Sequence, residues 1–301
     1  MDRLESMSIL LSAVEAGSLS AASRALGTPL ATVSRKVSEL ETHLKTRLLN
    51  RSSRRLTLTE AGRSYVAACK RILEDVREAE RAASGEYSAP RGDLVITAPI
   101  VFGRLHVLPV AIEFLKTYPD IDIRIVFADR LFNLFEDKVD LAVRIGALPD
   151  SSLVATRVGS IRRVVCASPA YFAKRGLPKR PQELDAHSCV RFEALSSPDT
   201  WTFTVGKSDK PFAIHSRLIV NTAEAAIDAA IAGIGIARVL SYQIAAATRA
   251  GTLAVALREF EPGPWPVSLV HDSGRPLPIK LRAFIDFAAP RLKTRLAESA
   301  I

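Results

Sequence analysis

Hydroxyl and cationic side chains gather in one stretch of the chain, residues 18–62, in a pattern suited to holding a nucleic acid. Between Arg24 and Arg55 there are eight basic residues and two acidic ones, within a chain whose formal net charge is +9. Neutralisation of phosphates by Lys and Arg supplies most non-specific affinity for DNA. A solvated surface on an ordinary helical bundle could carry the same charge, so the charge indicates DNA binding only together with the elements that position it.

Two short helices on either side of a Gly27–Pro29 turn are the elements expected to position these side chains. Ser20 is the expected N-cap of the first helix, whose small apolar face comprises Ala21, Ala22, Ala25 and Leu26. In the second helix apolar residues recur at spacings of three and four and predict one buried stripe, namely Val33, Val37, Leu40 and Leu44. The opposite side carries hydroxyls and cations, which suits a DNA major groove.

The segment after the second helix predicts a two-stranded wing. Its residues 51–55 (RSSRR) lie between the apolar pairs Leu48/Leu49 and Leu56/Leu58, so the tip would present cations to phosphate. Residues 1–58 are therefore predicted to form a winged helix-turn-helix that binds double-stranded DNA. The side chains expected to face the groove are Thr28, Leu30, Thr32, Ser34, Arg35 and Lys36, with the last two reaching guanine or phosphate. Those expected to hold backbone phosphates are Ser18, Ser20, Arg51, Ser53, Arg54 and Arg55.

Residues 59–90 are predicted to form a long linker helix followed by a polar hinge. Thr57 and Glu60 have the spacing of a capping box. Small and apolar residues then recur at spacings of three and four at positions 61, 65, 68, 72, 76, 79 and 83. A helix this long has little of its own chain to pack on, which favours pairing with a second copy; the alternative is a helix that lies on its own domain. The hinge follows at residues 84–92 (SGEYSAPRG).

Residues 91–301 predict an α/β domain of two lobes. Short apolar strands such as Leu94–Ile96 and Val139–Ile145 alternate with helical patterns, which is typical of doubly wound units with parallel sheets. We expect lobe I to comprise residues 91–161 and 266–301, lobe II to comprise residues 162–265, and the chain to cross between them near 159–165 and 262–268.

A small-molecule effector is expected in the cleft between the lobes, at the carboxyl ends of the strands. The candidate residues are Thr97, Ala98, Pro99, Ile100, Ala128, Asp129, Arg144, Gly146, Trp201 and Thr222. Two of these strand ends also open helices, whose free N–H groups favour an anionic ligand. Arg144 either binds that anion or forms a salt bridge to Asp129, and Trp201 either walls the pocket or packs in the core.

Several function classes find no support in the sequence. No apolar run reaches the length of a membrane span, and the first residues lack the pattern of a signal peptide, so we expect a cytoplasmic protein. The three cysteines have no close spacing and are expected to be buried. The five histidines show no metal-binding spacing, and there is no G-x-S-x-G elbow or complete dinucleotide fingerprint. We therefore expect no metal, no cofactor and no catalysis.

Four motifs together give the chain a resemblance to the LysR-type transcriptional regulators along essentially its whole length: SLSAASRAL, TVSRKVSELE, RLLNRSSRRLTLTEAG and DLAVRIG. The resemblance implies a winged helix-turn-helix, a linker helix and a two-lobed effector domain like a periplasmic solute-binding protein. It also implies homodimers and homotetramers that bind near promoters and change DNA bending when an inducer is bound. A solute-binding protein of a transport system is the alternative, but it needs export and has no use for the wing.

One position departs from the family pattern. The recognition helix of the family often begins Ser-Gln-Pro-Ala-Val-Ser, and Leu30 stands here where that glutamine usually reads a base. Apolar contact with a thymine methyl group, or readout of DNA shape, would then replace a hydrogen bond at this position.

Overall fold

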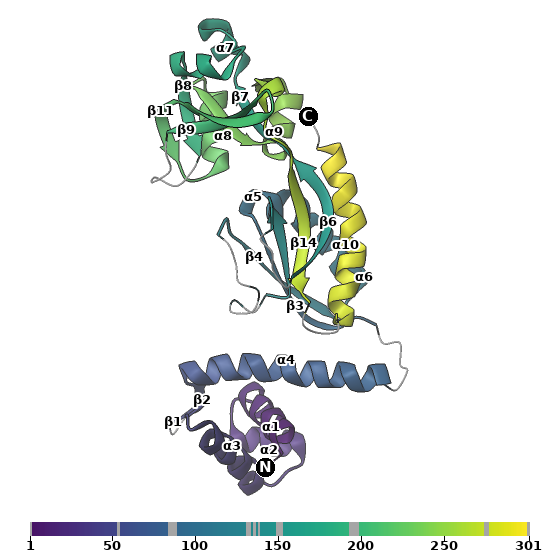
Figure 1. Ribbon diagram of the computed structural model, residues 1–301. Coiled ribbons are helices and arrows are strands. Elements are labelled where there is room, and N and C mark those ends of the chain that lie inside the picture. Colours follow the sequence, from purple (N-terminus) through teal and green to yellow (C-terminus); the bar gives the residue numbers. More distant parts are fainter. Residues whose placement is uncertain are drawn as a thin grey trace. The chain divides into compact units, whose positions relative to one another are not determined.

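A computed structural model of the chain shows two compact units, Met1–Ala89 (unit 1) and Pro90–Ile301 (unit 2), and the division falls within the polar stretch at residues 84–92 (Figure 1). The structure describes residues 2–52, 55–83, 89–130, 134, 137, 139–148, 153–192, 199–273 and 277–299. No helix in these ranges is long and apolar enough to cross a membrane.

Unit 1 is a winged helix-turn-helix followed by a long helix. Its elements are α1 (Arg3–Glu15), α2 (Leu19–Leu26), α3 (Leu30–Leu44), β1 (Leu49–Ser52), β2 (Arg55–Leu58) and α4 (Glu60–Ala83). The two strands of the wing pair antiparallel, with Leu49 opposite Leu58. The predicted stripe of α3 is confirmed, because Val33, Val37 and Leu40 are fully buried against residues of α1 and the wing.

Two caps differ from those predicted. Ser18, and not Ser20, is the N-cap of α2, because its hydroxyl oxygen accepts the N–H of Ala21 at 3.1 Å. Thr57 is held in β2 opposite Asn50 and cannot cap α4. Instead the hydroxyl of Thr59 accepts the N–H of Gly62 at 2.9 Å.

The apolar face predicted for α2 is only partly correct. Ala22 is fully buried between the helices, but Ala25 and Leu26 are exposed. The residue spacing of so short a helix does not fix how far its apolar face extends.

The first half of α4 packs on its own unit. Val66 and Cys69 are buried in the unit 1 core, and Tyr65 and Leu73 are partly buried against it. For this half the alternative, a helix that lies on its own domain, describes the packing, and pairing with a second copy stays a prediction for the side of α4 that is not covered. Ile72, on the predicted stripe, is 39% exposed.

Unit 2 contains two five-stranded sheets (Figure 1). The first has the order β4-β3-β5-β14-β6 and comprises β3 (Gly92–Ala98), β4 (Ile121–Phe127), β5 (Leu141–Ile145), β6 (Leu153–Ile161) and β14 (Trp265–Asp272). Its helical segments are α5 (Ile100–Phe102), the π-helical turn η1 (Gly103–Val107), α6 (Leu108–Thr117) and α10 (Ile279–Glu298).

The second sheet has the order β11-β8-β12-β7-β13, with β7 (Arg163–Ala167), β8 (Ser188–Phe192), β11 (His215–Val220), β12 (Ile236–Leu240) and β13 (Ala254–Ala256). A separate hairpin is formed by β9 (Thr200–Val205) and β10 (Ser208–Ala213). The helices are α7 (Pro169–Arg175), α8 (Ala223–Ile231) and α9 (Ser241–Arg249), with 3-10 turns η2 (Pro181–Ala186) and η3 (Arg258–Phe260).

Both sheets are mixed, so the prediction of parallel sheets is wrong in part. Strands β3, β4 and β5 are parallel, as are β8, β11 and β12, but β14 runs antiparallel to β5, and β7 antiparallel to β12. The antiparallel strands arise because the chain crosses twice between the sheets. It leaves the first sheet at β6 and enters the second at β7, with only Arg162 between them, and it returns to the first sheet as β14.

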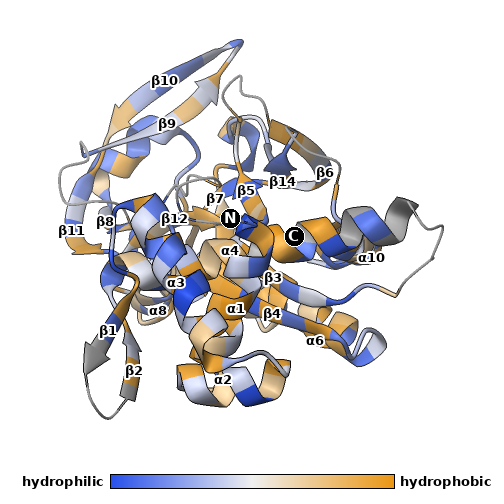
Figure 2. Cartoon of the chain, turned by 90° about the horizontal axis from the view of Figure 1, so that it is seen from below, coloured by the Kyte–Doolittle hydropathy of each residue, from blue (hydrophilic) through white to orange (hydrophobic). Residues whose placement is uncertain are grey.

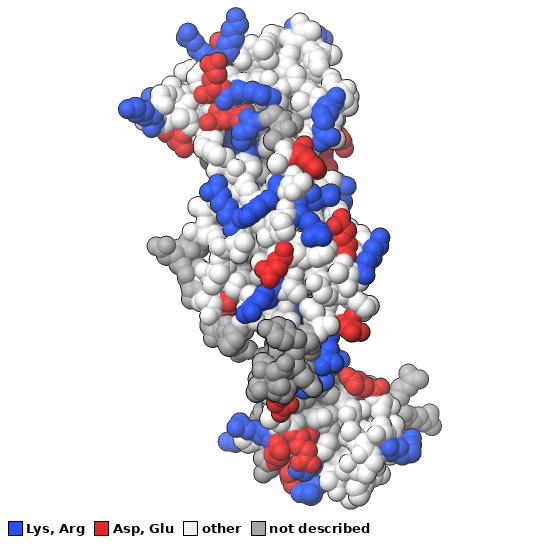
Figure 3. All heavy atoms as spheres, turned by 90° about the vertical axis from the view of Figure 1, so that its right-hand side faces the viewer, with Lys and Arg blue, Asp and Glu red and all other residues white. Residues whose placement is uncertain are grey.

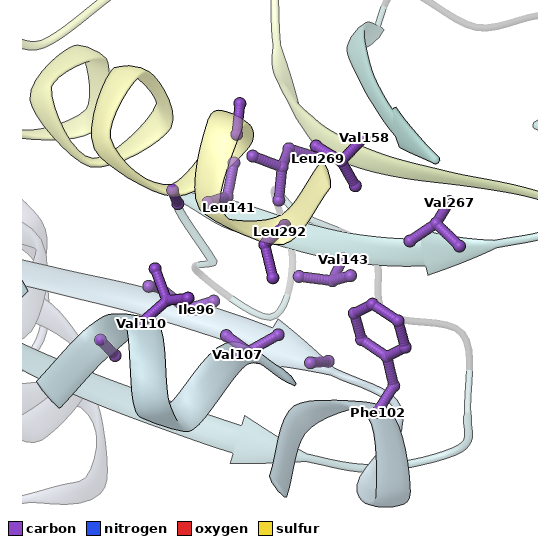
Figure 4. Packing of buried hydrophobic residues seen from close by; sticks show 14 of the residues in the cluster. Ile96, Phe102, Val107, Val110, Leu141, Val143, Val158, Val267, Leu269 and Leu292 are labelled. Carbon is purple, nitrogen blue, oxygen red and sulfur yellow. The ribbon is translucent and has the colours of Figure 1, made fainter. Parts of the chain in front are cut away.

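The largest core of unit 2 lies between its first sheet and two helices. Figure 4 shows Val110 of α6 and Leu292 of α10 pointing toward Ile96, Leu141 and other aliphatic side chains of the strands. Helix α10 lies along β6 and β14 (Figure 1) and ends at Glu298. This packing fixes the strand ends at which an effector was expected.

Candidate nucleic-acid interface and effector site

Helix α3 presents the face that was expected to enter a DNA groove. Leu30 at its first turn is 46% exposed, and the side chain of Arg35 is 61% exposed. Thr32 and Ser34 are half-buried at the edges of this face. Figure 2 shows α3 with many hydrophilic segments, whereas α1 is largely hydrophobic. Both Leu30, the first residue of α3, and Arg35, five residues further along, are thus accessible to a ligand.

Arg35 is held by a neighbour on its own helix. Its Nη1 lies 2.8 Å from Oε1 of Glu39, one turn further along. Exposed ion pairs of this kind contribute at most about 1 kcal/mol. A DNA phosphate or a guanine edge can therefore replace Glu39 as the partner of Arg35 at small cost.

Lys36 does not face the same way. Its ammonium group forms an ion pair with the carboxylate of Glu5 on α1, and its side chain is only 14% exposed. The expectation that Lys36 projects into the groove beside Arg35 is therefore corrected. The packing of α1 against α3 gives this lysine a partner within the unit.

The hydroxyl residues expected to contact DNA have different roles in the unit. Ser18 is occupied as the cap of α2, whereas Ser20 is exposed. The hydroxyl of Thr28 donates to the carbonyl of Leu26 at 3.3 Å in the turn before α3. Ser53 and Arg54 lie outside the described residues, and for Arg51 and Arg55 only the strand backbone is described.

Charge is not uniform around unit 1. On the face shown in Figure 3, acidic and basic side chains of this unit lie next to one another. Lys70 of α4 and Glu15 of α1, 3.5 Å apart, are one pair of this kind. A face of mixed sign is a poor surface for a polyanion.

In unit 2, two of the residues expected to bind the effector are buried in the first sheet. Thr97 is 2% exposed, and its hydroxyl donates to the carbonyl of Val126 at 3.0 Å. Ala98 is 1% exposed, and its carbonyl accepts the N–H of Ala128 at 3.0 Å. Neither Thr97 nor Ala98 presents a polar group at the end of β3.

The strand end next to them is capped by a carboxylate of the chain. After Pro99, the backbone N–H of Ile100 donates to Oδ1 of Asp129 at 3.0 Å. This N–H was expected to receive an anionic ligand. The internal carboxylate already occupies it.

Arg144 lies half-buried on β5, in register with Ser268 of β14. Desolvation lowers the pKa of its guanidinium, and the charge of Asp137 opposes this effect. The carboxylate whose charge raises the pKa of Arg144 is thus that of Asp137. Two residues beyond it, Gly146 ends the strand with a φ of +107° and donates its N–H to the carbonyl of Pro266 at 2.9 Å.

Trp201 belongs to the core of the second sheet. It is 1% exposed and packs among buried residues such as Phe203 and Tyr171, with the guanidinium of Arg238 5.3 Å from its ring. Its placement in a pocket wall is therefore corrected, and core packing was the right alternative. Thr222 is exposed, and its hydroxyl oxygen accepts the N–H of Ala225 at 3.3 Å as the N-cap of α8.

The structure shows a contact between the regions of the two sheets that the sequence did not predict. Tyr242 on α9 packs edge-on against Phe102 and His106, with ring centroids 5.3 and 5.5 Å away. Arg104 lies 3.7 Å from Glu224 of α8. Burial and the charge of Arg295 lower the pKa of His106 to about 4. The π-helical turn that holds Arg104 and His106 gave no signal in the residue spacing.

Among the residues that the structure describes, no group of His, Cys, Asp and Glu could hold a metal ion. All three thiols are buried, as predicted.

Two family models account for most of the chain. Residues 4–63 match the bacterial regulatory helix-turn-helix protein, lysR family, and residues 88–293 match the LysR substrate binding domain. The chain belongs to the LysR family. Its winged helix-turn-helix and its two-sheet α/β unit are the two parts that these models describe.

Individual relatives extend the match over nearly the full length. The LysR-family chain is 36% identical over 288 residues to an HTH-type transcriptional regulator of Xanthomonas campestris pv. campestris (strain 8004), covering 94% of this chain and 84% of that protein. It is 30% identical to the HTH-type transcriptional activator AaeR of Escherichia coli (strain K12), covering 95% of this chain and 93% of that protein.

Among solved structures, CrgA, a LysR-type transcriptional regulator from Neisseria meningitidis, matches with a TM-score of 0.61 and 32% identity, covering 96% of this chain and 98% of that one. The chain is thus a LysR-type DNA-binding transcriptional regulator with an effector-binding domain. A transport function has no support among these relatives.

Proposed function

We propose that this regulator reads promoter DNA with the outward face of α3. We further propose that a small molecule bound between the two sheets of unit 2 changes how the protein binds and bends that DNA. The exposure of Arg35 and of Leu30 on a helix held by the fully buried Val33, Val37 and Leu40 carries the proposal. A helix supported in this way can enter a major groove without loss of its packing.

We assign the segments of the chain accordingly. Residues 1–58 form the DNA-binding domain, residues 59–90 the linker helix and hinge, and residues 91–301 the effector domain. Within the last, lobe I comprises residues 91–161 and 266–301, and lobe II comprises residues 162–265. The assignment is supported by the strand orders, because β6 and β14 belong to one sheet while β7 and β13 belong to the other.

In the groove, Arg35 contacts a guanine edge or a phosphate, and Leu30 contacts a thymine methyl group. An arginine that binds guanine contributes about 1–3 kcal/mol of discrimination against other bases. The wing residues Arg51, Ser53, Arg54 and Arg55 hold the backbone. The exposure of Leu30 and Arg35 supports the roles on α3, and the basic sequence of residues 51–55 supports those of the wing.

The effector in this proposal is an anionic or aromatic molecule, bound near the ends of β3, β4 and β5 and the start of α8. Arg144 offers a partly desolvated cation, and Thr222 an exposed hydroxyl. An anion can use the N–H of Ile100 only after Asp129 has left it. Binding there is therefore coupled to displacement of the Asp129 carboxylate.

The chain pairs with another copy through the uncovered side of α4, where Ile72 is exposed. Paired units place two α3 helices on two half-sites of one operator. We propose a homodimer or a homotetramer that acts in the cytoplasm and catalyses no reaction.

Footprinting of the intergenic region beside the regulator's own gene tests this function. The full-length protein should protect two half-sites about one helical turn, or a multiple of it, apart. A panel of small carboxylates and aromatics should contain a member that changes the pattern of protection. Protection that spreads over every duplex with no sequence preference would contradict the proposal.

A further inference from the structure

Unit 1 contains a hollow beside the reading face of α3. It has a volume of about 550 Å³ and lies between the last two turns of α3 and the start of the wing. Its lining residues are Ser38, Glu41, Thr42, Lys45, Thr46, Arg47 and Leu49. None of them is among the DNA contacts assigned above.

The hollow continues the outward face of α3. Arg35, Ser38 and Thr42 follow one another at spacings of three and four, so their side chains lie along one side of the helix. Lys45, Thr46 and Arg47 are exposed at the end of this row. A duplex that Arg35 contacts would therefore have the hollow next to it.

Lys45 has a backbone conformation that is unfavourable for a residue with a Cβ atom. Its φ is +51°, and only one other non-glycine residue in the described part of the chain, Leu257, has a positive φ. The position directly follows α3, where glycine or asparagine is usual because a Cβ atom is unfavourable in the left-handed region. Side chains kept in such conformations cluster at functional sites.

Glu41, the one acidic residue of the lining, is engaged by the backbone. Its Oε1 accepts the N–H groups of Leu48 and Leu49 at 2.8 and 3.0 Å. The carbonyl of Arg47 in turn accepts the hydroxyl of Thr59 at 2.8 Å. These bonds fix the turn that carries Arg47 and give Oε1 of Glu41 two partners within the chain.

We propose that this hollow binds a phosphate of the DNA backbone that flanks the groove entered by α3. Lys45 and Arg47 neutralise the phosphate, and the hydroxyl of Thr46 is in place to donate a hydrogen bond to it. Two cations and a hydroxyl at the rim of an open hollow match a backbone phosphate better than an apolar ligand. The proposal rests on DNA binding by this unit and adds a contact that is independent of base sequence.

The first test compares Lys45→Gln with Lys70→Gln in the full-length protein. Both changes remove one exposed lysine, but Lys70 lies on α4 beside Glu15 and away from the hollow. Binding is measured on the footprinted operator and on a random duplex between about 50 and 200 mM salt. For Lys45→Gln we expect Kd to rise about 3- to 10-fold on both duplexes, and the slope of log K against log salt to become shallower by about 0.9. Lys70→Gln should leave the slope unchanged.

The second test separates a structural role for Lys45 from contact with DNA. Lys45→Gly relieves the left-handed conformation, so its Tm should be higher than that of the wild type, while its affinity for DNA should fall as it does in Lys45→Gln. If Lys45 serves only the end of α3, DNA affinity will stay at the wild-type value, and the proposal is overturned.

Phosphate-ethylation interference then locates the contact. One phosphate should interfere with binding of the wild type and no longer interfere with Lys45→Gln. Equal salt slopes for Lys45→Gln and Lys70→Gln, or interference patterns that do not differ, would overturn the phosphate site. A loss confined to the operator would also overturn it, because it would indicate base reading.

Discussion

The carboxylate of Asp129 accepts a hydrogen bond from the backbone N–H of Ile100 at 3.0 Å, across 29 residues of sequence. The donor lies at the end of β3 and the acceptor follows β4, the neighbouring parallel strand. An anionic effector that binds at this strand end therefore competes with the carboxylate of Asp129 for the N–H of Ile100. Binding of such an effector would break the hydrogen bond between Ile100 and Asp129.

We expect Asp129→Asn to increase the affinity of a carboxylate effector several-fold. The asparagine keeps an acceptor for Ile100 but removes a like charge from the site. Calorimetric titration of the full-length protein checks this, with Asp122→Asn, an exposed change on β4, as the control. Weaker binding to Asp129→Asn would show instead that Asp129 is itself a contact of the effector.

Arg35→Ala should weaken binding to the operator more than binding to a random duplex. The lost discrimination should be about 1–3 kcal/mol if Arg35 reads a guanine. Competition measurements with the two duplexes give this difference directly, and Arg24→Ala, an exposed cation on α2, serves as the comparison. Equal losses of affinity for the operator and for the random duplex would show that Arg35 contacts only a phosphate and reads no base.

Gly62→Ala should destabilise unit 1. A Cβ atom built on Gly62 would lie 2.0 Å from the carbonyl oxygen of Leu48, and a backbone atom cannot move aside without disturbing the wing. We expect a loss of about 1–3 kcal/mol, measured by thermal melting together with DNA binding. Gly263→Ala, whose Cβ meets no atom within 4 Å, is the matched control and should melt like the wild type. An unchanged Tm for Gly62→Ala would contradict the close approach of α4 to Leu48.

Unit 2 should lose stability as the pH falls from about 6.5 to 4, in part through His106. Its pKa in the folded chain, about 4, is below the ordinary value of 6.5, so folding favours the neutral imidazole. The resulting stabilisation is complete above pH 6.5 and is lost as the pH falls toward 4, by about 3 kcal/mol at most.

His106→Phe should reduce this dependence while it keeps the ring packing against Phe102 and Tyr242. Urea unfolding at several pH values checks it, since both tryptophans, Trp201 and Trp265, lie in unit 2 and report its unfolding. His215→Gln, at an exposed strand position, is the control. Identical pH profiles for His106→Phe and the wild type would exclude His106 as the source.

The sequence by itself determined the elements whose residues lie close together along the chain. The spacing of Val33, Val37 and Leu40 predicted a buried stripe on α3, and that stripe is buried. The wing and the strands β3 and β5 were likewise predicted, because hydrophobic periodicity within one element depends only on the geometry of that element. The motifs around α3 were also sufficient to indicate the family.

Only the tertiary structure decided which side chains of those elements are available. Lys36 and Arg35 are neighbours in sequence, yet Lys36 is paired with Glu5 because α1 packs against that side of α3. Trp201 is buried because its hairpin packs on the second sheet, and the N–H of Ile100 is capped because Asp129 follows the adjacent strand β4. Each of these contacts is formed by residues that are distant in sequence. Such contacts depend on how whole elements pack against one another, and no local sequence pattern predicts them.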